Sequence, residues 1–342
     1  MLRIVVMTVA CLAVWSGLHA QEYDRLVAEA EGKYTAGEYA GALDLYGQAF
    51  QEGDGSLSDF YNAACTAALA GEPDIAFTYL DKAMAAGVLE KQWLETDQDL
   101  AGLQSDPRWD ELLATVDARL EALAASFPDA RPDGPVVDLP EPRMTGDVSV
   151  EEALQGRRSI RAYTDVPLTV SEISQLLWAA YGINKPIEGA PDFLRGGLRT
   201  APSAGALYPL EVYLVARNVT GLAPGIYWYK SETHQLVTLG EGDLWQEVSD
   251  AGLNQPHFDT AAAAIVYSAV FERNTRKYGE RGRERYVCMD LGHSAENVYL
   301  QAFALKIGTC AIGAFSDLAL KQAIGMTKEE EPLYIMPVGK IE

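Results

Sequence analysis

A segment rich in proline, residues 126–148, divides this chain of 342 residues. A proline ring fixes φ and removes a backbone donor, so no regular helix can run through so dense a series. We therefore expect a semi-rigid extended linker between two domains, which also suits a chain of this length at about 150 residues per domain. Its prolines are Pro128, Pro132, Pro135, Pro140 and Pro142.

The stretch before this linker, residues 21–125, repeats itself with a spacing of 34 residues. The repeated positions pair Ala30 with Ala64, Gly37 with Gly71, Ala42 with Ala76 and Ala49 with Ala83. Small residues at these offsets let two antiparallel helices approach closely. The pattern resembles the tetratricopeptide repeat, and the resemblance implies an all-α domain whose groove docks a protein partner.

Acidic residues are concentrated in this repeat region. The whole chain has a formal net charge of −22, and residues 21–125 carry 21 acidic against 6 basic residues. A chain this acidic gains nothing from contact with a phosphate backbone, which argues against a nucleic-acid partner. Two alternatives stay open for the acidic helices: they dock a basic peptide or protein, or their charges only solvate the outer faces.

The first 20 residues have the layout of a secretory signal peptide. Arg3 precedes an apolar run from Ile4 to Trp15, and small or polar residues lead to Ala20. The run is too short to span a bilayer. We expect an exported, periplasmic protein, or a membrane-anchored one if the signal is not cleaved.

The second half, residues 149–342, carries two motifs with chemical character. The first is Arg157-Arg158-Ser159-Ile160-Arg161, whose three guanidinium groups and hydroxyl suit an anion such as phosphate; taken alone, a basic surface patch is an equal alternative. The second is a glycine-containing turn, APSAGALYP over residues 201–209, followed by an apolar strand. Such a turn exposes backbone amides and admits a flat ligand.

Together these motifs resemble the FMN-dependent nitroreductase family, and the turn is most similar to its SagB-type branch of azoline dehydrogenases. Further agreement covers Ile173–Gly182, Gly221–Tyr229, Asp290–His293 and Ile312–Asp317. The resemblance implies an α+β fold with a mixed sheet sandwiched by helices over residues 149–342. It also implies FMN as the cofactor, a small-molecule or peptide substrate, and a homodimer with two FMN sites at its interface.

The resemblance assigns roles to individual residues. Those that would hold the phosphate and ribityl end of FMN are Arg157, Arg158 and Ser159, with Arg161 close by. Those that would line the ring edge are Pro202, Ser203, Ala204 and Gly205. Gly313 and Ala314 would place backbone amides near the flavin N5, where hydride is transferred.

A lysine–tyrosine pair acts as the base beside the flavin in the azoline-oxidising branch. Lys277 and Tyr278 stand at the resembling position of this chain. The alternative is a cationic loop that docks the second subunit or the FMN phosphate.

The sequence predicts no metal site, because its histidines lack the spacing of paired metal ligands. Cys65, Cys288 and Cys310 would remain after signal cleavage, and their odd number predicts a free thiol and no structural disulfide. The favoured function is an FMN oxidoreductase with a repeat module that recruits a partner or substrate. The alternative is a non-catalytic repeat scaffold with a vestigial flavin domain.

Overall fold

The computed structural model describes residues 2–342, with side chains described from His19 onward. The chain divides into two compact units, Met1–Ala125 and Ser126–Glu342. The predicted signal peptide, residues 1–20, has most of its side chains outside the described part. Over the described residues, no helix is both long enough and apolar enough to cross a membrane.

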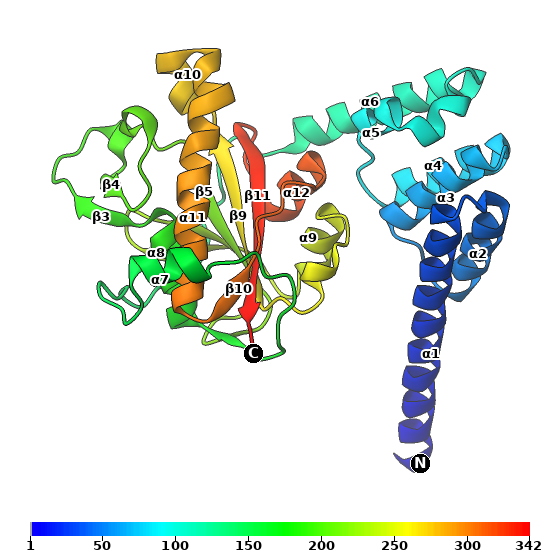
Figure 1. Cartoon of the computed structure of the whole chain (residues 1–342), viewed down its shortest axis with the longest axis horizontal. Helices are drawn as coiled ribbons and strands as arrows, with labels where there is room; N and C mark the ends of the chain where they lie inside the picture. The colour runs from blue at the N-terminus through cyan, green and yellow to red at the C-terminus, as the bar shows by residue number, and fades with distance from the viewer. Residues whose placement is uncertain (1) are drawn as a thin grey trace. The chain divides into compact units, whose positions relative to one another are not determined.

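The first unit is built from helices, which confirms the predicted all-α character of this region (Figure 1). Gly37 and Gly71 form the turns between paired helices with φ of +77° and +81°, a conformation that favours glycine. The alanines at the repeat positions are fully buried where the helices meet. The elements are α1 (Leu2–Thr35), α2 (Tyr39–Glu52), α3 (Leu57–Leu69), α4 (Pro73–Ala86), α5 (Lys91–Thr96), the 3-10 helix η1 (Gln98–Leu103) and α6 (Pro107–Ser126).

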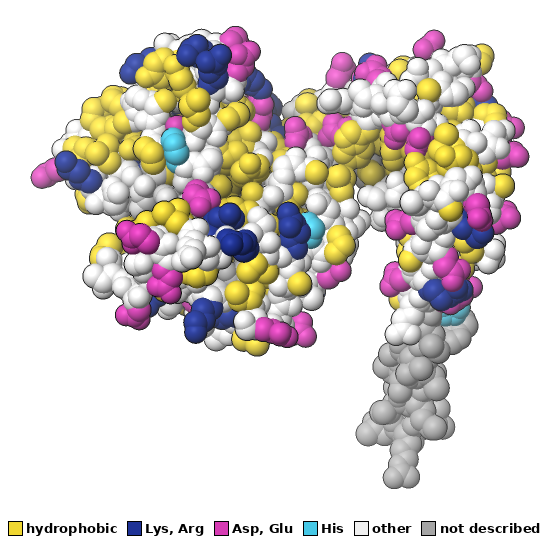
Figure 2. Space-filling model, in the orientation of Figure 1, with side chains coloured by type: hydrophobic (Ala, Val, Ile, Leu, Met, Phe, Trp, Pro, Cys, Tyr) yellow, Lys and Arg dark blue, Asp and Glu magenta, His cyan; other side chains and the backbone are white. Residues whose placement is uncertain are grey.

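Asp and Glu side chains are spread over the visible face of this unit (Figure 2). Several pair with the few basic residues: Arg25 contacts Glu22 and Glu29 at 2.5 Å, and Arg108 contacts Asp74 at 2.8 Å. Exposed pairs of this kind contribute little to stability.

The second unit is organised around a seven-stranded sheet of order β1-β8-β7-β5-β9-β11-β10. All neighbours in this sheet are antiparallel. The expected α+β class is therefore confirmed, whereas the sheet is not mixed; the described parallel pair, β2 with β6, is a separate ribbon. The strands are β1 (Val136–Asp138), β2 (Leu168–Thr169), β3 (Ile183–Pro186), β4 (Gly197–Arg199), β5 (Leu210–Ala216), β6 (Val219–Thr220), β7 (Gly225–Lys230), β8 (Gln235–Glu241), β9 (Ala263–Val270), β10 (Ile307–Thr309) and β11 (Glu330–Lys340).

Helices cover both faces of this sheet, so its central strands are buried on both sides. On β5, Val212 and Leu214 belong to the core under α8 and α11, while Tyr213 and Val215 belong to the core under α9 and α12. This alternation follows the two-residue period of a strand. The helices are α7 (Val150–Gly156), α8 (Val170–Tyr181), α9 (Trp245–Ala251), α10 (Glu272–Tyr278), α11 (Cys288–Ala304) and α12 (Asp317–Ile324), with short 3-10 turns η2 (Asp192–Leu194), η3 (Ala204–Ala206) and η4 (Pro256–Phe258), and a π-helical turn η5 (Gly282–Val287).

The proline-rich segment 126–148 differs from the expected linker, because it belongs to the second unit. Its residues Val136–Asp138 form β1, which pairs with β8 at the edge of the sheet, where proline is tolerated on either side. Leu139, which follows β1, is buried in the core under α8 and α11. The segment is thus part of the folded sheet domain.

Candidate functional site

The arginine motif follows α7 and runs beside the edge strand β10. The Ile160 amide donates to the Thr309 carbonyl at 2.9 Å, which fixes the motif against the sheet. Arg158 donates to the carbonyls of Arg157 and Gln155 at 2.7 and 3.0 Å, while its side chain stays exposed. We call Arg157, Arg158, Ser159 and Arg161 the arginine cluster.

Tyr299 on α11 contacts two members of this cluster, although no pattern in the sequence indicated a role for it. The Arg157 guanidinium lies 5.0 Å from the centre of the Tyr299 ring, and the Tyr299 hydroxyl lies 3.1 Å from Ser159 Oγ. The same hydroxyl accepts a hydrogen bond of 2.7 Å from the Ala311 amide. A tyrosine in an amphipathic helix pattern is usually a packing residue, so only the fold could identify it.

The predicted ring-contacting residues Gly313 and Ala314 lie exposed in the loop after β10. Gln255 donates to the Ala314 carbonyl at 2.9 Å, and this contact holds the loop beside η4. His257 of η4 has a lowered pKa because burial and the positive charge of Arg161 both disfavour its protonation. The structure therefore brings the 313–314 loop and the arginine cluster into one region.

The predicted ring-edge turn, Pro202–Gly205, is held at the other end of α11. Asp290 accepts hydrogen bonds from the Ser203 hydroxyl at 2.5 Å and from the Ala204 amide at 3.2 Å. Ser203 Oγ also accepts the Tyr208 amide at 3.0 Å, so the hydroxyl is engaged inside the turn. Burial raises the pKa of Asp290, and the two hydrogen bonds oppose that rise.

Lys277 and Tyr278 end α10 directly over this turn. A Cβ placed on Gly205 would lie 2.6 Å from the Tyr278 hydroxyl and 3.0 Å from Lys277 Nζ. The sequence-predicted pair and the predicted turn are thus adjacent, and Lys277 is exposed. We call Lys277, Tyr278 and Pro202–Gly205 the lysine–tyrosine cluster.

Replacing Gly205 with alanine should destabilise the chain by about 1–2 kcal/mol, because Gly205 has a φ of +67°, which is costly for residues with a Cβ. The new methyl group would also displace the Tyr278 hydroxyl. Urea denaturation measures the free energy of unfolding. The same substitution at Gly292 is a control, since a Cβ there meets nothing within 4 Å in a helix; equal costs at both positions would contradict the argument.

A buried ion-pair network anchors α10 to the sheet. Glu211, only 2% exposed, contacts Arg195 and Arg273 at 2.6 Å each. Arg131 of the proline-rich segment lies 3.5 Å from Glu211 and 2.8 Å from Glu330. Burial alone would raise the pKa of Glu211, but the three guanidinium groups outweigh it and hold the pKa well below its usual range. Arg273 belongs to α10, so the network anchors the helix that carries Lys277.

The two clusters do not meet within one chain. Asp290 and Tyr299, which hold them, are nine residues apart on α11, about 13 Å at 1.5 Å per residue. Figure 1 shows α10 at one end of α11 and β10 at the other. The predicted cofactor residues therefore form two separate half-sites.

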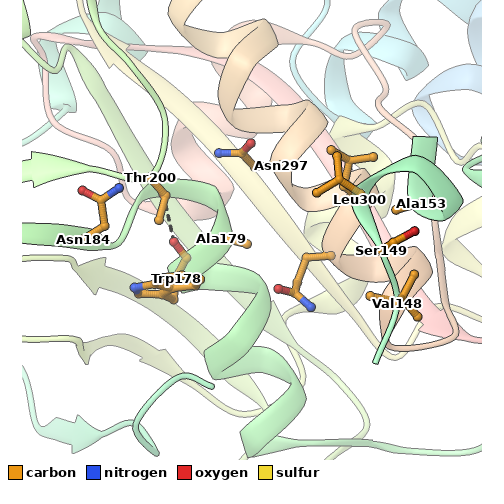
Figure 3. A pocket seen from close by; sticks show the side chains of 12 residues that line it. Val148, Ser149, Ala153, Trp178, Ala179, Asn184, Thr200, Asn297 and Leu300 are labelled. Carbon is orange, nitrogen blue, oxygen red and sulfur yellow. Dashed lines mark hydrogen bonds between the residues drawn. The ribbon is translucent and has the colours of Figure 1, made fainter. Parts of the chain in front are cut away.

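A pocket of about 320 Å³ opens between α7, α8 and α11, beside the ring-edge turn (Figure 3). Trp178 of α8 lines it, and Thr200, just before the turn, donates to the Trp178 carbonyl at 3.0 Å. Asn297 of α11 contributes a polar side chain. Two other aromatic residues of this unit belong to the core: Tyr181 is buried, and Trp228 donates to Glu211 at 2.9 Å.

One group of possible metal ligands lies in the first unit, where the sequence predicted none. Single ligand atoms of Cys65, Asp97 and Asp99 lie within 4.8 Å of one another. Asp97 already accepts hydrogen bonds from Tyr61 at 3.0 Å and from Cys65 at 3.5 Å. Burial and the negative charge of Asp97 raise the pKa of the Cys65 thiol, which favours the neutral thiol. Hydrogen bonding within the group thus accounts for its geometry.

The three cysteines with described side chains, Cys65, Cys288 and Cys310, are free thiols. Cys310 is buried, and its sulfur lies 4.0 Å from the Tyr163 hydroxyl. His293 is exposed on α11.

The fold and the two clusters define an α+β domain of the nitroreductase type. The nitroreductase family model matches residues 154–340, and the chain belongs to this family. A Methanocaldococcus jannaschii protein named as a nitroreductase is 40% identical over 194 residues, which is 57% of this chain and 92% of that protein. The microcin B17-processing protein McbC of Escherichia coli is 27% identical over 154 residues, 42% of this chain.

Solved structures show the same fold. A Ralstonia eutropha protein named as a nitroreductase superposes with a TM-score of 0.50 at 26% identity, over 64% of this chain and 98% of that protein. One from Anabaena variabilis has a TM-score of 0.52 at 24% identity, over 61% of this chain and 42% of that chain. The chain spans about half the length of McbC.

Proposed function

We propose that this protein is an FMN-dependent oxidoreductase whose site is completed by a second copy of the chain. The observation that carries the proposal is the pair of half-sites on a nitroreductase fold. One offers exposed cationic donors and an exposed backbone loop at residues 313–314, and the other offers a lysine–tyrosine pair over a glycine turn. Each half-site lacks what the other supplies.

The arginine cluster fits the phosphate of FMN by the chemistry of its donors. Arg157, Arg158 and Arg161 present guanidinium groups, and Ser159 adds a neutral hydroxyl. Planar guanidinium groups bind phosphate oxygens in a bidentate manner. Among the described side chains, Glu296 is the one carboxylate that pairs with these arginines, at 3.6 Å from Arg157. The donor set therefore has capacity for a dianion.

FMN, when bound, supplies an acceptor or donor of hydride at its ring. The chain's own part is to bind and to orient. The backbone amides of Gly313 and Ala314 would face the ring, and the turn around Gly205 would let its edge approach. Lys277 would take a proton from the substrate, with the Tyr278 hydroxyl beside it.

A homodimer would complete the site if one protomer contributed its arginine cluster and its partner the lysine–tyrosine cluster. Two equivalent sites then follow from the twofold symmetry of such a dimer. The pocket beside Trp178 and Asn297 lies on the α7–α8–α11 face next to this site.

For the substrate, we propose an azoline ring, either in a small molecule or within a peptide. The similarity to a protein named for processing microcin B17 supports a peptide context. The repeat unit would recruit the substrate or a partner protein, and the N-terminal signal would place both outside the cytoplasm, in the periplasm.

The test of the cofactor is the visible absorption spectrum of residues 21–342, purified without added flavin. Stoichiometric FMN, identified after release, would support the proposal. A folded protein that is colourless and also refuses added FMN would overturn it and favour a repeat scaffold with a vestigial flavin domain.

Replacing Arg158 with alanine should weaken FMN binding roughly 10- to 100-fold, because charge-assisted hydrogen bonds contribute about 1.5–3 kcal/mol each. Binding of riboflavin, which lacks the phosphate, should change little. Titration of the apoprotein by flavin fluorescence measures both affinities. Arg143→Ala removes an exposed arginine elsewhere in the same unit; the assignment fails if both variants lose the same affinity.

A further inference from the structure

We infer that Tyr299 is a positioning residue for the phosphate of FMN, and that it gives the protein a preference for binding FMN over riboflavin. The inference rests on the proposed function. Tyr299 lies half-buried on α11 and contacts three parts of the candidate site. It is not expected to touch the reacting atoms.

The first contact orients Arg157. Its guanidinium carbon lies 5.0 Å from the centre of the Tyr299 ring, within the range of a cation–π interaction. A guanidinium group held against a ring loses less conformational freedom when it binds an anion. The ring therefore prepares Arg157 for a phosphate oxygen while Glu296, at 3.6 Å, holds its Nε.

The second contact sets the direction of a hydrogen bond. The Tyr299 oxygen accepts the Ala311 amide at 2.7 Å, and Ser159 Oγ lies 3.1 Å away. When the tyrosine proton points to Ser159 Oγ, the serine proton is free to point outward. A phosphate at the arginine cluster would accept a hydrogen bond from the Ser159 hydroxyl, and the chain of hydrogen bonds from Tyr299 through Ser159 would strengthen each member.

The third contact, with Ala311, fixes the position of the segment that would face the flavin ring relative to the residues that would face the phosphate. Ala311 lies two residues before Gly313, and the Ile160 amide of the arginine motif donates to the carbonyl of Thr309, the last residue of β10. One hydroxyl thus fixes both the segment that would face the ring and the serine that would face the phosphate. A ligand with a phosphate at the matching distance gains from this arrangement, whereas riboflavin does not.

The experiment compares FMN and riboflavin affinities of the apoprotein, residues 21–342, by flavin fluorescence titration. Tyr299→Phe keeps the ring under Arg157 but removes the hydroxyl. We expect it to weaken FMN binding roughly 5- to 10-fold and riboflavin binding less than about 2-fold. Tyr299→Leu, which also removes the ring, should weaken FMN binding roughly 30-fold. Tyr227→Phe is the control. Tyr227 lies on β7, away from the site, and its hydroxyl donates to the Ala223 carbonyl at 2.8 Å.

The outcomes separate the inference from the proposed function. A selective loss for FMN in Tyr299→Phe supports the inference. Equal losses for both flavins, or no loss for either, overturn it while the wild-type chain still binds FMN. A wild-type chain that binds neither flavin overturns the proposed function and the inference with it.

Discussion

Replacing Glu211 with glutamine is expected to destabilise the second unit by about 3–5 kcal/mol, because it leaves buried guanidinium groups without their shared carboxylate. Glu211 is 2% exposed and contacts Arg195 and Arg273 at 2.6 Å. A glutamine oxygen can still accept a hydrogen bond, but its NH₂ group would face a guanidinium group. Urea denaturation at pH 7 measures the loss as a lower midpoint.

The matched control is Asp129→Asn, which makes the same chemical change in an exposed pair. Asp129 is 88% exposed and lies 2.9 Å from Lys328, so its loss should cost less than about 1 kcal/mol. Equal costs for the two variants would show that burial of the Glu211 network adds nothing to stability.

The same network predicts a dependence on pH. Because the folded pKa of Glu211 is held well below its ordinary value of about 4.3, its contribution is fully present above that value and is lost as pH falls through the folded pKa. The stability difference between the wild type and Glu211→Gln should stay constant from about pH 7 to pH 5 and shrink below about pH 4. A difference that grows on acidification would contradict this sign.

Arg131 connects the proline-rich segment to this ion-pair network. It lies in the segment that the prolines mark as a linker, yet it contacts Glu211 and Glu330 inside the second unit and stacks 4.4 Å from the centre of the Trp228 ring. The segment that follows the repeat helices is therefore bound to the carboxylate that also holds α10 through Arg273. A truncation that begins after residue 148 would remove this arginine and an edge strand.

The sequence alone predicted the α+β class and the helical character of residues 21–125, because both depend on local pattern or on motifs in order. It also identified Lys277 and Gly205, which the fold places side by side. The role of residues 126–148 was misjudged, since proline density reports local stiffness but not whether an edge strand is available to pair with β1.

Other features of the site could not be predicted because they depend on contacts between distant residues. Asp290 supports a turn almost ninety positions earlier in the chain, and Tyr299 joins the arginine motif to the loop after β10. Neither residue type is unusual in a helix. The separation of the two half-sites along α11 is likewise a property of the fold.

Replacing Lys277 with alanine is expected to lower turnover by about 10²- to 10⁴-fold, the usual contribution of a positioned general base. The proposed reaction would oxidise an azoline to an aromatic azole: the lysine amine would take one proton, and bound FMN would supply the acceptor for one hydride. A synthetic peptide with a single thiazoline is the substrate, and mass spectrometry follows the loss of two hydrogens. FMN content should stay that of the wild type, because Lys277 would act on the substrate.

The adjacent Arg276 provides the control for this variant. It is on the same helix, its side chain is 74% exposed, and it pairs with Glu272 at 3.0 Å, so Arg276→Ala removes an equal charge without touching the turn at Gly205. We expect its turnover within about threefold of the wild type, since surface charges act weakly through water. If Lys277→Ala keeps its turnover, the lysine is not the base. If it instead loses FMN or disrupts the proposed dimer, the cationic-loop alternative explains this segment, because a base that acts only on substrate would leave cofactor and assembly unchanged.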